Sequence, residues 1–247
     1  MSVLGVLIDY RLELALWVAL SFVLHAVASD LAWHYRRPRP GRLGRWVEGL
    51  RSWPYTSWLL QGLRFLYYIG IPYLALLRGA ALPRLMGLSG LDWPRGVSLG
   101  VPLGGGAFLV LALIWRWYAR AIAGLPHPSA DPDPAANWWV ALREAIYAES
   151  HWAFYRCLPI LLLDDYYTGV FLGFLLVSLE WWISPAWRAA LSLPEGAPNV
   201  LMSWSMAFAM AIIFLFVRNL WLIVPIHWAI EMGCRRMLAI AYRQEGV

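Results

Sequence analysis

Charged and imidazole side chains gather in one otherwise apolar stretch of the sequence, residues 138–163. Arg143 and Glu144 stand near its start, whereas Glu149, His151 and Arg156 lie deeper, among aromatic and aliphatic residues. An ionisable group inside a membrane-spanning helix is costly unless it is paired or hydrated, so such residues are candidates for function. We therefore start from this stretch and ask what chemistry it could support.

Two later stretches carry groups of the same kind. Residues 220–241 contain His227 and Glu231, which are four residues apart and so share one face of a helix. Glu180 is the only charged residue of residues 166–183. Such a set fits a buried Glu that acts as general base on water, with His donors for an oxyanion. It also fits a divalent metal held by Glu and His, with Glu149, His227 and Glu231 as its first candidates. Buried ion pairs that only stabilise the protein are the structural alternative.

Helical geometry sorts the candidates of residues 138–163 by face. Residues seven apart differ by about 20° around a helix, so Glu149 and Arg156 share one face and Glu144 and His151 share another. The rise over seven residues is about 10 Å, so the first pair can touch only if both side chains reach along the helix. His151 points about 160° away from Glu149, which predicts that the two side chains serve different neighbours.

The composition indicates what must position these residues. Hydrophobic residues make up 61% of the 247 residues and charged residues only 14%, against about 25% in soluble domains. This composition leaves too little polar surface for a soluble protein, which excludes a cytosolic enzyme, a disordered protein and a nucleic-acid-binding module. The basic residues stand between apolar runs, as they do in membrane proteins. We expect one all-α integral membrane domain over residues 1–247, with the lipid bilayer as its partner. Cys157 and Cys234 are interpreted as small core residues.

About seven apolar stretches are long enough to span a membrane, which predicts a polytopic transmembrane helix bundle. They cover residues 12–32, 55–79, 98–121, 138–163, 166–183, 201–217 and 220–241. The first resembles a signal peptide with the cleavage-site-like sequence Ala26-Val27-Ala28, but the residues before it carry a net negative charge. An uncleaved first helix therefore fits better. The short joint at Arg218-Asn219 predicts either a tight hairpin or one broken helix.

The arginine distribution predicts the orientation. Residues 33–54 hold six Arg residues, so we expect this basic loop to be cytoplasmic. Seven alternating spans then place Arg235 and Arg236 in the cytoplasm as well. The prediction is a multi-pass protein of the cell membrane with a cytoplasmic C-terminus.

Two motif blocks resemble the CPBP family, which includes the type II CAAX prenyl endopeptidases and bacteriocin-processing proteins. Residues 216–231 contain Leu-Trp, an apolar run with Pro225, and His227-x-x-x-Glu231, similar to the family's last block, which ends in His-x-x-x-Asn. Residues 149–156 resemble its Glu-Glu-x-x-x-Arg block. The resemblance covers approximately residues 98–241. It implies an intramembrane endopeptidase that acts on a membrane protein or a lipidated peptide, with Glu149 activating water, Arg156 orienting the site and His227 assisting as an oxyanion donor.

The sequence departs from the family pattern at several positions. Ala148 and Ser150 flank Glu149, so the Glu pair is broken, and Arg156 comes three residues later than in the family block. The middle block, Phe-x-x-x-His, has no His, and the last block ends in Glu231 instead of Asn. Glu144, His151 and Glu180 are the candidates for supporting roles.

These departures leave three functions open. The first is a divergent endopeptidase with Glu149, Arg156, His227 and Glu231 as its catalytic residues. The second is a non-catalytic scaffold or immunity-type protein on the same fold. The third is a metal-binding membrane protein that uses Glu149, His151, Glu180, His227 and Glu231. No cofactor is certain from the sequence, and a divalent metal fits either a metal-dependent protease or the third function.

Overall fold

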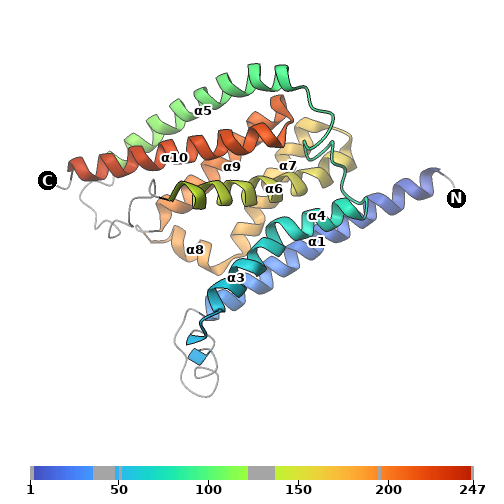
Figure 1. Ribbon diagram of the computed structural model, residues 1–247, viewed down its shortest axis with the longest axis horizontal. Coiled ribbons are helices and arrows are strands. Elements are labelled where there is room, and N and C mark those ends of the chain that lie inside the picture. Colours follow the sequence, from blue (N-terminus) through green and yellow to red (C-terminus); the bar gives the residue numbers. More distant parts are fainter. Residues whose placement is uncertain (1–2, 36–47, 50–51, 122–136, 194–195, 246–247) are drawn as a thin grey trace.

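The structure is a bundle of long helices, shown in Figure 1. It is a computed structural model that describes residues 3–35, 48–49, 52–121, 137–193 and 196–245. Within these residues the chain is helical and contains no strand, which confirms the predicted all-α class. Residues 36–47 and 50–51 of the predicted basic loop lie outside the described part of the chain.

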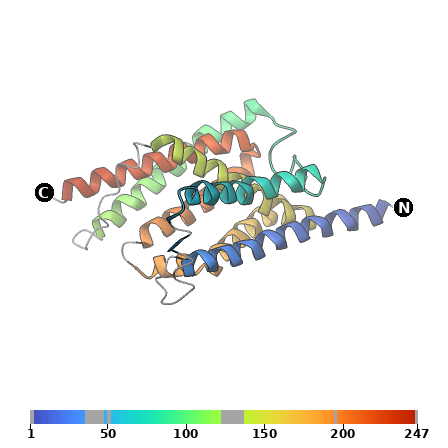
Figure 2. The same ribbon diagram turned by 60° about the horizontal axis from the view of Figure 1, so that its bottom comes forward.

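The helices follow the predicted apolar stretches closely. Their bounds are α1 (Val3–Tyr35), α3 (Thr56–Phe65), the π-helical turn η1 (Leu66–Gly70), α4 (Ile71–Leu77), α5 (Trp93–Ala121), α6 (Trp138–Leu163), α7 (Tyr166–Ile183), α8 (Pro185–Leu191), α9 (Ala197–Val217) and α10 (Leu220–Glu245). Helix α4 contacts α1, and α5 contacts α10 and runs beside it in Figures 1 and 2.

Five of these helical segments are long and apolar enough to cross a membrane. They are Tyr10–Tyr35, Thr56–Leu77, Trp93–Ala121, Tyr166–Ile183 and Ala197–Val217. The other two predicted spans are helices, α6 and α10, but neither is among these candidates. Both helices carry several charged residues, which lowers their mean hydropathy. The chain is thus a helical membrane protein, and the count of about seven spans stays a prediction.

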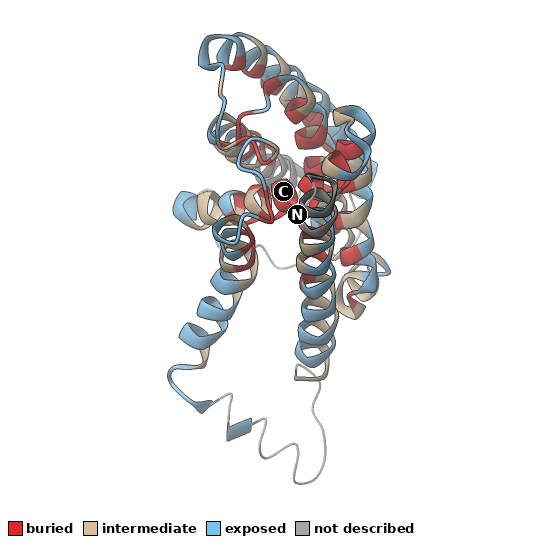
Figure 3. Ribbon diagram, turned by 90° about the vertical axis from the view of Figure 1, so that its right-hand side faces the viewer, coloured by how far each residue is buried: buried red, intermediate tan, exposed pale blue. Residues whose placement is uncertain are grey.

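Helix α6 lies at the centre of the bundle and contacts α7, α10, α1 and the turn η1. Its residues from Glu149 to Cys157 are buried, with the exception of the half-buried Ser150. A helix buried on all sides belongs in a core, whereas a surface helix buries one stripe. Figure 3 shows the buried residues gathered in the interior, while the ends of α1 and α3 beside the grey trace are mostly exposed.

Tight turns join the long helices and fix their order. Asp164 ends α6 in the left-handed conformation, with φ of 52°, and Asp165 then caps α7 by accepting hydrogen bonds from the backbone of Tyr167 and Thr168. Hydrogen bonds from Thr168 and the Tyr167 backbone hold the pKa of Asp165 below its usual value. Arg218 ends α9 in the same way, with φ of 45°, and the buried Asn219 accepts hydrogen bonds from the start of α10. The joint at residues 218–219 is therefore a tight turn between two helices.

The π-helical turn η1 interrupts the second predicted span. The sequence predicted one continuous helix over residues 55–79, but residues 66–70 adopt the wider π conformation between α3 and α4. Isolated π turns inside α-helices occur frequently at functional sites. This turn presents Tyr67 and Tyr68, whose rings both contact the ring of His151 on α6.

Two glycines let α7 approach α6 closely. A Cβ atom added at Gly169 would lie 2.7 Å from the Ile160 backbone, and one added at Gly173 would lie 2.8 Å from the Arg156 Cα. Glycines four residues apart are typical of close helix packing in membranes. This contact places Arg156 directly against α7.

We expect Gly169→Ala to lower the free energy of unfolding by about 1–3 kcal/mol, because the added methyl group meets the backbone of α6. Reversible unfolding of the purified protein in mixed micelles would measure the change. Gly105→Ala on α5 is the matched control, since no atom lies within 4 Å of its added Cβ. Equal stability of the two variants would contradict the close α6–α7 packing.

Candidate functional site

Glu149 and His227 form a direct contact in the interior of the bundle. The Nδ1 atom of His227 lies 2.8 Å from Oε1 of Glu149, although the two residues are 78 positions apart in the chain. A carboxylate can only accept, so with Glu149 ionised the proton stands on His227 Nδ1. Glu149 is 0% exposed and His227 is 4% exposed. Helices α6 and α10 thus place two of the predicted catalytic residues within hydrogen-bonding distance.

Arg156 completes the contact from the next turns of α6. Its guanidinium lies 3.5 Å from Oε2 of Glu149, so the two side chains reach along the helix as the seven-residue spacing requires. The guanidinium also lies over the ring of Phe214, 4.1 Å from its centre. Oε2 of Glu149 has no hydrogen-bond partner in the described part of the chain. This buried oxygen therefore retains the capacity to accept a hydrogen bond.

Glu231 extends the site toward the exposed end of α10. Its Oε2 atom lies 3.7 Å from Nε2 of His227, and its Oε1 atom accepts hydrogen bonds from Arg235 at 2.7 and 2.9 Å. Five side chains thus form a row of alternating charge type, which we name the Glu149 network. Its members are Arg156, Glu149, His227, Glu231 and Arg235.

Aromatic rings and a small groove border the Glu149 network. The Trp152 ring stacks on His227, with 5.3 Å between ring centres and 19° between planes, and it meets Trp181 edge-on. Trp152 and Arg156 line a small groove, together with residues of α7 and α9. The space inside this groove is enough for about one water molecule. The network is closed by packing on its other sides.

Glu180 and His151 belong to a second polar cluster, apart from the Glu149 network. Glu180 accepts hydrogen bonds from Tyr67 at 2.6 Å and from His151 Nε2 at 2.9 Å, and His25 Nδ1 lies 2.8 Å from it. Tyr155 and Ser21 extend the cluster through hydroxyl hydrogen bonds. We name these residues the Glu180 cluster: Glu180, His151, His25, Tyr67, Tyr155 and Ser21.

The candidate residues therefore fall into two separate groups. Glu149 and His227 meet on one side of α6, and His151 meets Glu180 on the other, as the predicted angle of about 160° requires. No hydrogen bond or ion pair between described residues joins the two groups. Within the same residues, no group of three or more His, Cys, Asp or Glu side chains is placed to hold a metal ion, so the five-ligand set does not form.

Glu144 lies outside both groups. It pairs with Arg64 of α3 at 2.6 Å and with Arg143 at 3.0 Å, near the start of α6. Its side chain is 34% exposed. Glu144 therefore joins α3 and α6 near the surface. It shares a helix face with His151 as predicted, but the described residues contain no hydrogen bond between these two side chains, so Glu144 does not support the site.

Sequence reasoning missed four members of the Glu180 cluster. His25 carried a usable signal, because it is a histidine inside a predicted span, four residues after Ser21 on the same helix face. Tyr67 carried none, because its direction depends on the π-helical turn. Tyr155 reads as an ordinary core aromatic.

Comparison with known proteins yields no relative. No protein-family model matches the chain, and neither a curated protein nor a solved structure matches it. The interpretation of the site therefore depends on the geometry above and on the two motif blocks.

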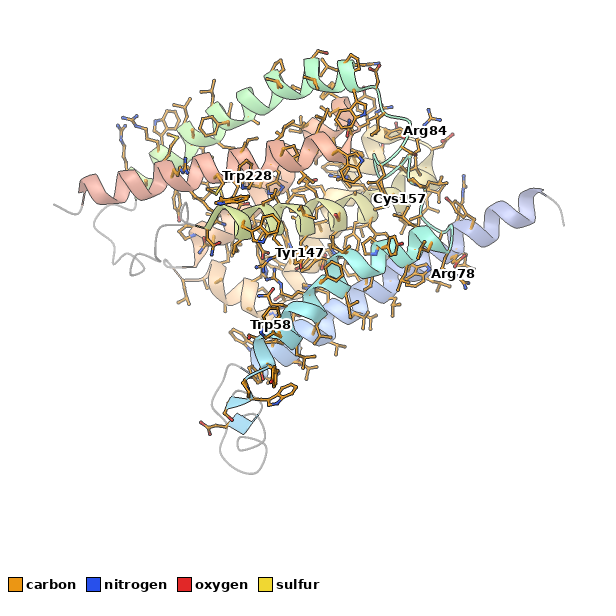
Figure 4. All side chains as sticks on the ribbon, viewed as in Figure 1. Trp58, Arg78, Arg84, Tyr147, Cys157 and Trp228 are labelled. Atoms are coloured by element: carbon orange, nitrogen blue, oxygen red, sulfur yellow. The ribbon has the colours of Figure 1, made fainter. Side chains whose placement is uncertain are left out.

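We expect Glu180→Ala to lower the free energy of unfolding by about 3–5 kcal/mol, because it leaves two imidazoles and a phenol without their common acceptor. Glu13→Ala removes the partner of Arg78 in an exposed pair between α1 and the end of α4 (Figure 4) and serves as the control. Its expected effect is less than about 1 kcal/mol. Unfolding in mixed micelles measures both, and a Glu180→Ala effect as small as the control would contradict a structural role for the cluster.

Proposed function

We propose that this protein is a divergent, CPBP-like intramembrane endopeptidase that hydrolyses a peptide bond of a membrane-associated substrate. The observation that carries the proposal is the 2.8 Å contact between Glu149 and His227. The resemblance assigns these residues to two different motif blocks and gives them the roles of base and oxyanion donor. Their direct contact supports the proposal, because both residues stand at one place in the bundle interior.

The proposed base is the Oε2 atom of Glu149, which has no hydrogen bond among the described residues. It takes a proton from a water molecule, whose oxygen then bonds to the carbonyl carbon of the substrate peptide. The resulting oxyanion is stabilised by N–H donors of Arg156 and His227. Glu149 passes its proton to the leaving nitrogen as the C–N bond breaks. Charges in a low-dielectric interior act more strongly than in water, which suits a site between helices.

Glu231 and Arg235 support the imidazole of His227 in this proposal. The family block has Asn where this chain has Glu231, and the Glu231 carboxylate lies 3.7 Å from Nε2 of His227. Glu231 is held in turn by two hydrogen bonds from Arg235. The changed residue therefore helps to fix the orientation of the His227 ring.

We further propose that α6 and α10 cross the cell membrane with the five candidate spans, so that about seven spans alternate and the C-terminus is cytoplasmic. The length of both helices, 26 residues each, supports this. Their charged residues within the bundle are paired, which lowers the cost of insertion.

The orientation is testable with two exposed positions, at the start of α5 and in α10. In a chain whose Cys157 and Cys234 are replaced by Ala, we expect Arg95→Cys and Arg236→Cys to react with an impermeant maleimide from opposite sides of the membrane. Arg95→Cys is expected to react in intact cells and Arg236→Cys only after permeabilisation. Labelling of both from the same side would contradict the alternation.

Proteolysis is testable in proteoliposomes with quenched fluorescent peptides that each carry one apolar helix. We expect Glu149→Gln to lower the cleavage rate by at least about 100-fold, because the amide cannot accept the proton of water. Glu13→Gln, on the surface of α1, should retain the wild-type rate. Circular dichroism would establish that both variants are folded. Equal cleavage by wild type and Glu149→Gln would contradict the assigned base.

A second candidate function is a non-catalytic scaffold or immunity-type protein. The observation that favours it is the packing of Trp152 on His227, beside a groove too small for a peptide segment. In this case the Glu149 network is a buried ion-pair row that stabilises the bundle. No cleavage by the wild-type protein across the peptide set, with Glu149→Gln less stable than wild type, would favour this function over the first.

A further inference from the structure

The imidazole of His227 ends a row of four contacting rings. It stacks on Trp152 of α6, with 5.3 Å between ring centres and 19° between planes. Trp152 meets Trp181 of α7 edge-on, at 6.0 Å and 69°. Trp181 in turn stacks on Trp187 of α8, at 4.6 Å and 5°. We call these four side chains the aromatic row, and it links α10 to α6, α7 and α8.

The inner part of the aromatic row is enclosed in the bundle. Trp152 is 7% exposed and Trp181 is 9% exposed, while Trp187 at the outer end is half-buried. A tryptophan side chain is large and flat and has only two torsions, so it offers a rigid contact surface at a low cost in conformational entropy. The ring face on which His227 lies is therefore held in place by neighbours of its own.

The hydrogen bond to Glu149 does not by itself fix the plane of the His227 ring. It determines which edge of the ring faces the carboxylate, because Nδ1 lies 2.8 Å from Oε1. Rotation of an imidazole about its Cβ–Cγ bond is broad, so one bond at one edge leaves the ring free to tilt. Glu231 adds a contact of 3.7 Å at Nε2, which is longer than a hydrogen bond. The stacked indole of Trp152 supplies the missing constraint, because the imidazole cannot tilt toward it without overlap.

The plane of the His227 ring decides where its second nitrogen points. With Nδ1 turned toward Glu149, Nε2 is the nitrogen that remains for a substrate atom. A polar group stabilises a transition state only when it lies about 2.7–3.1 Å from the atom that develops charge, so its direction must be set in advance.

From the stacking geometry we propose that Trp152 is a positioning residue, which sets the direction of Nε2 of His227 and is itself held by Trp181. The two contacts on Trp152, one face-on and one edge-on, carry this inference. It rests on the proposed peptide hydrolysis and gives Trp152 a role that neither motif block assigns.

Exchange of the His227 Nδ1 proton with solvent tests the positioning without any substrate. NMR of the full-length protein in micelles, with ¹⁵N-labelled histidine, detects this proton, and its absence in His227→Gln assigns it. We expect Trp152→Leu to raise the exchange rate at least about tenfold, because the untethered ring leaves its hydrogen bond more often. Trp152→Phe keeps an aromatic face and should stay within about twofold of wild type. Trp181→Leu should raise the rate by less than Trp152→Leu does.

Cleavage of the quenched fluorescent peptides supplies a second measurement. We expect Trp152→Leu to lower kcat at least about tenfold with KM unchanged, because a misdirected Nε2 weakens a contact of the transition state only. Trp152→Phe should restore most of kcat. Trp139→Leu removes an exposed tryptophan of the same helix and is the matched control, with wild-type exchange and cleavage. Circular dichroism gives the folded fraction, to which both rates are referred.

Three results would overturn the proposal. Wild-type exchange and kcat in Trp152→Leu mean that the hydrogen bond to Glu149 is sufficient. Equal effects of Trp152→Phe and Trp152→Leu mean that the size of the side chain matters and the stacked ring does not. If Trp152→Leu does not fold, wild-type exchange in Trp181→Leu contradicts the support from the aromatic row. Absence of cleavage by wild type contradicts the proposed function instead, so the two failures are distinguishable.

Discussion

A buried carboxylate in an apolar bundle is the constraint on which the rest of this structure depends. Glu149 is fully buried, and an isolated charge at such a place would be prohibitively costly. Arg156 and His227 stand on its two sides, and Glu231 and Arg235 continue the alternation of charge toward the outer part of α10. The helices cannot separate along this row without leaving a charge uncompensated. The same pairing that stabilises the fold also leaves one carboxylate oxygen without a hydrogen bond.

Helix α6 carries this constraint because polar side chains on both of its faces contact other helices. One face holds Glu149 and Arg156 against α10 and α9, and the other holds His151 against α7 and η1. The glycines of α7 bring that helix close enough for both contacts. Trp228 fixes the start of α6 as well, since its Nε1 donates to the Trp138 carbonyl at 3.1 Å (Figure 4). Polar contacts thus specify how the apolar helices are arranged, because lipid tails are as apolar as the helix surfaces and give no hydrophobic driving force for one arrangement.

The sequence predicted the helices and half of the polar arrangement. Apolar runs and turn residues located all seven long helical stretches, because hydropathy and backbone capping are local properties. The spacing of Glu149 and Arg156 predicted a common helix face for the same reason, whereas their contact depends on both side chains reaching along the helix. The partition of Glu180 from His227 depended on how α7 and α10 pack around α6, which no local pattern encodes. His25 joined Glu180 across 155 positions of the chain, and only the folded bundle brings such residues together.

The π-helical turn has a consequence for how this protein can vary. A π turn holds one residue more than an α turn of the same height, so it behaves as a one-residue insertion inside a continuous helix. Removal of one residue between positions 66 and 70 would restore an α turn at this place, while α3 and α4 would keep their orientation. The side chains inside the turn would change direction, so Tyr67 would no longer point at Glu180. The link between Glu180 and the α3–α4 segment is thus gained or lost through a single codon, while α6, α9 and α10 keep their own contacts.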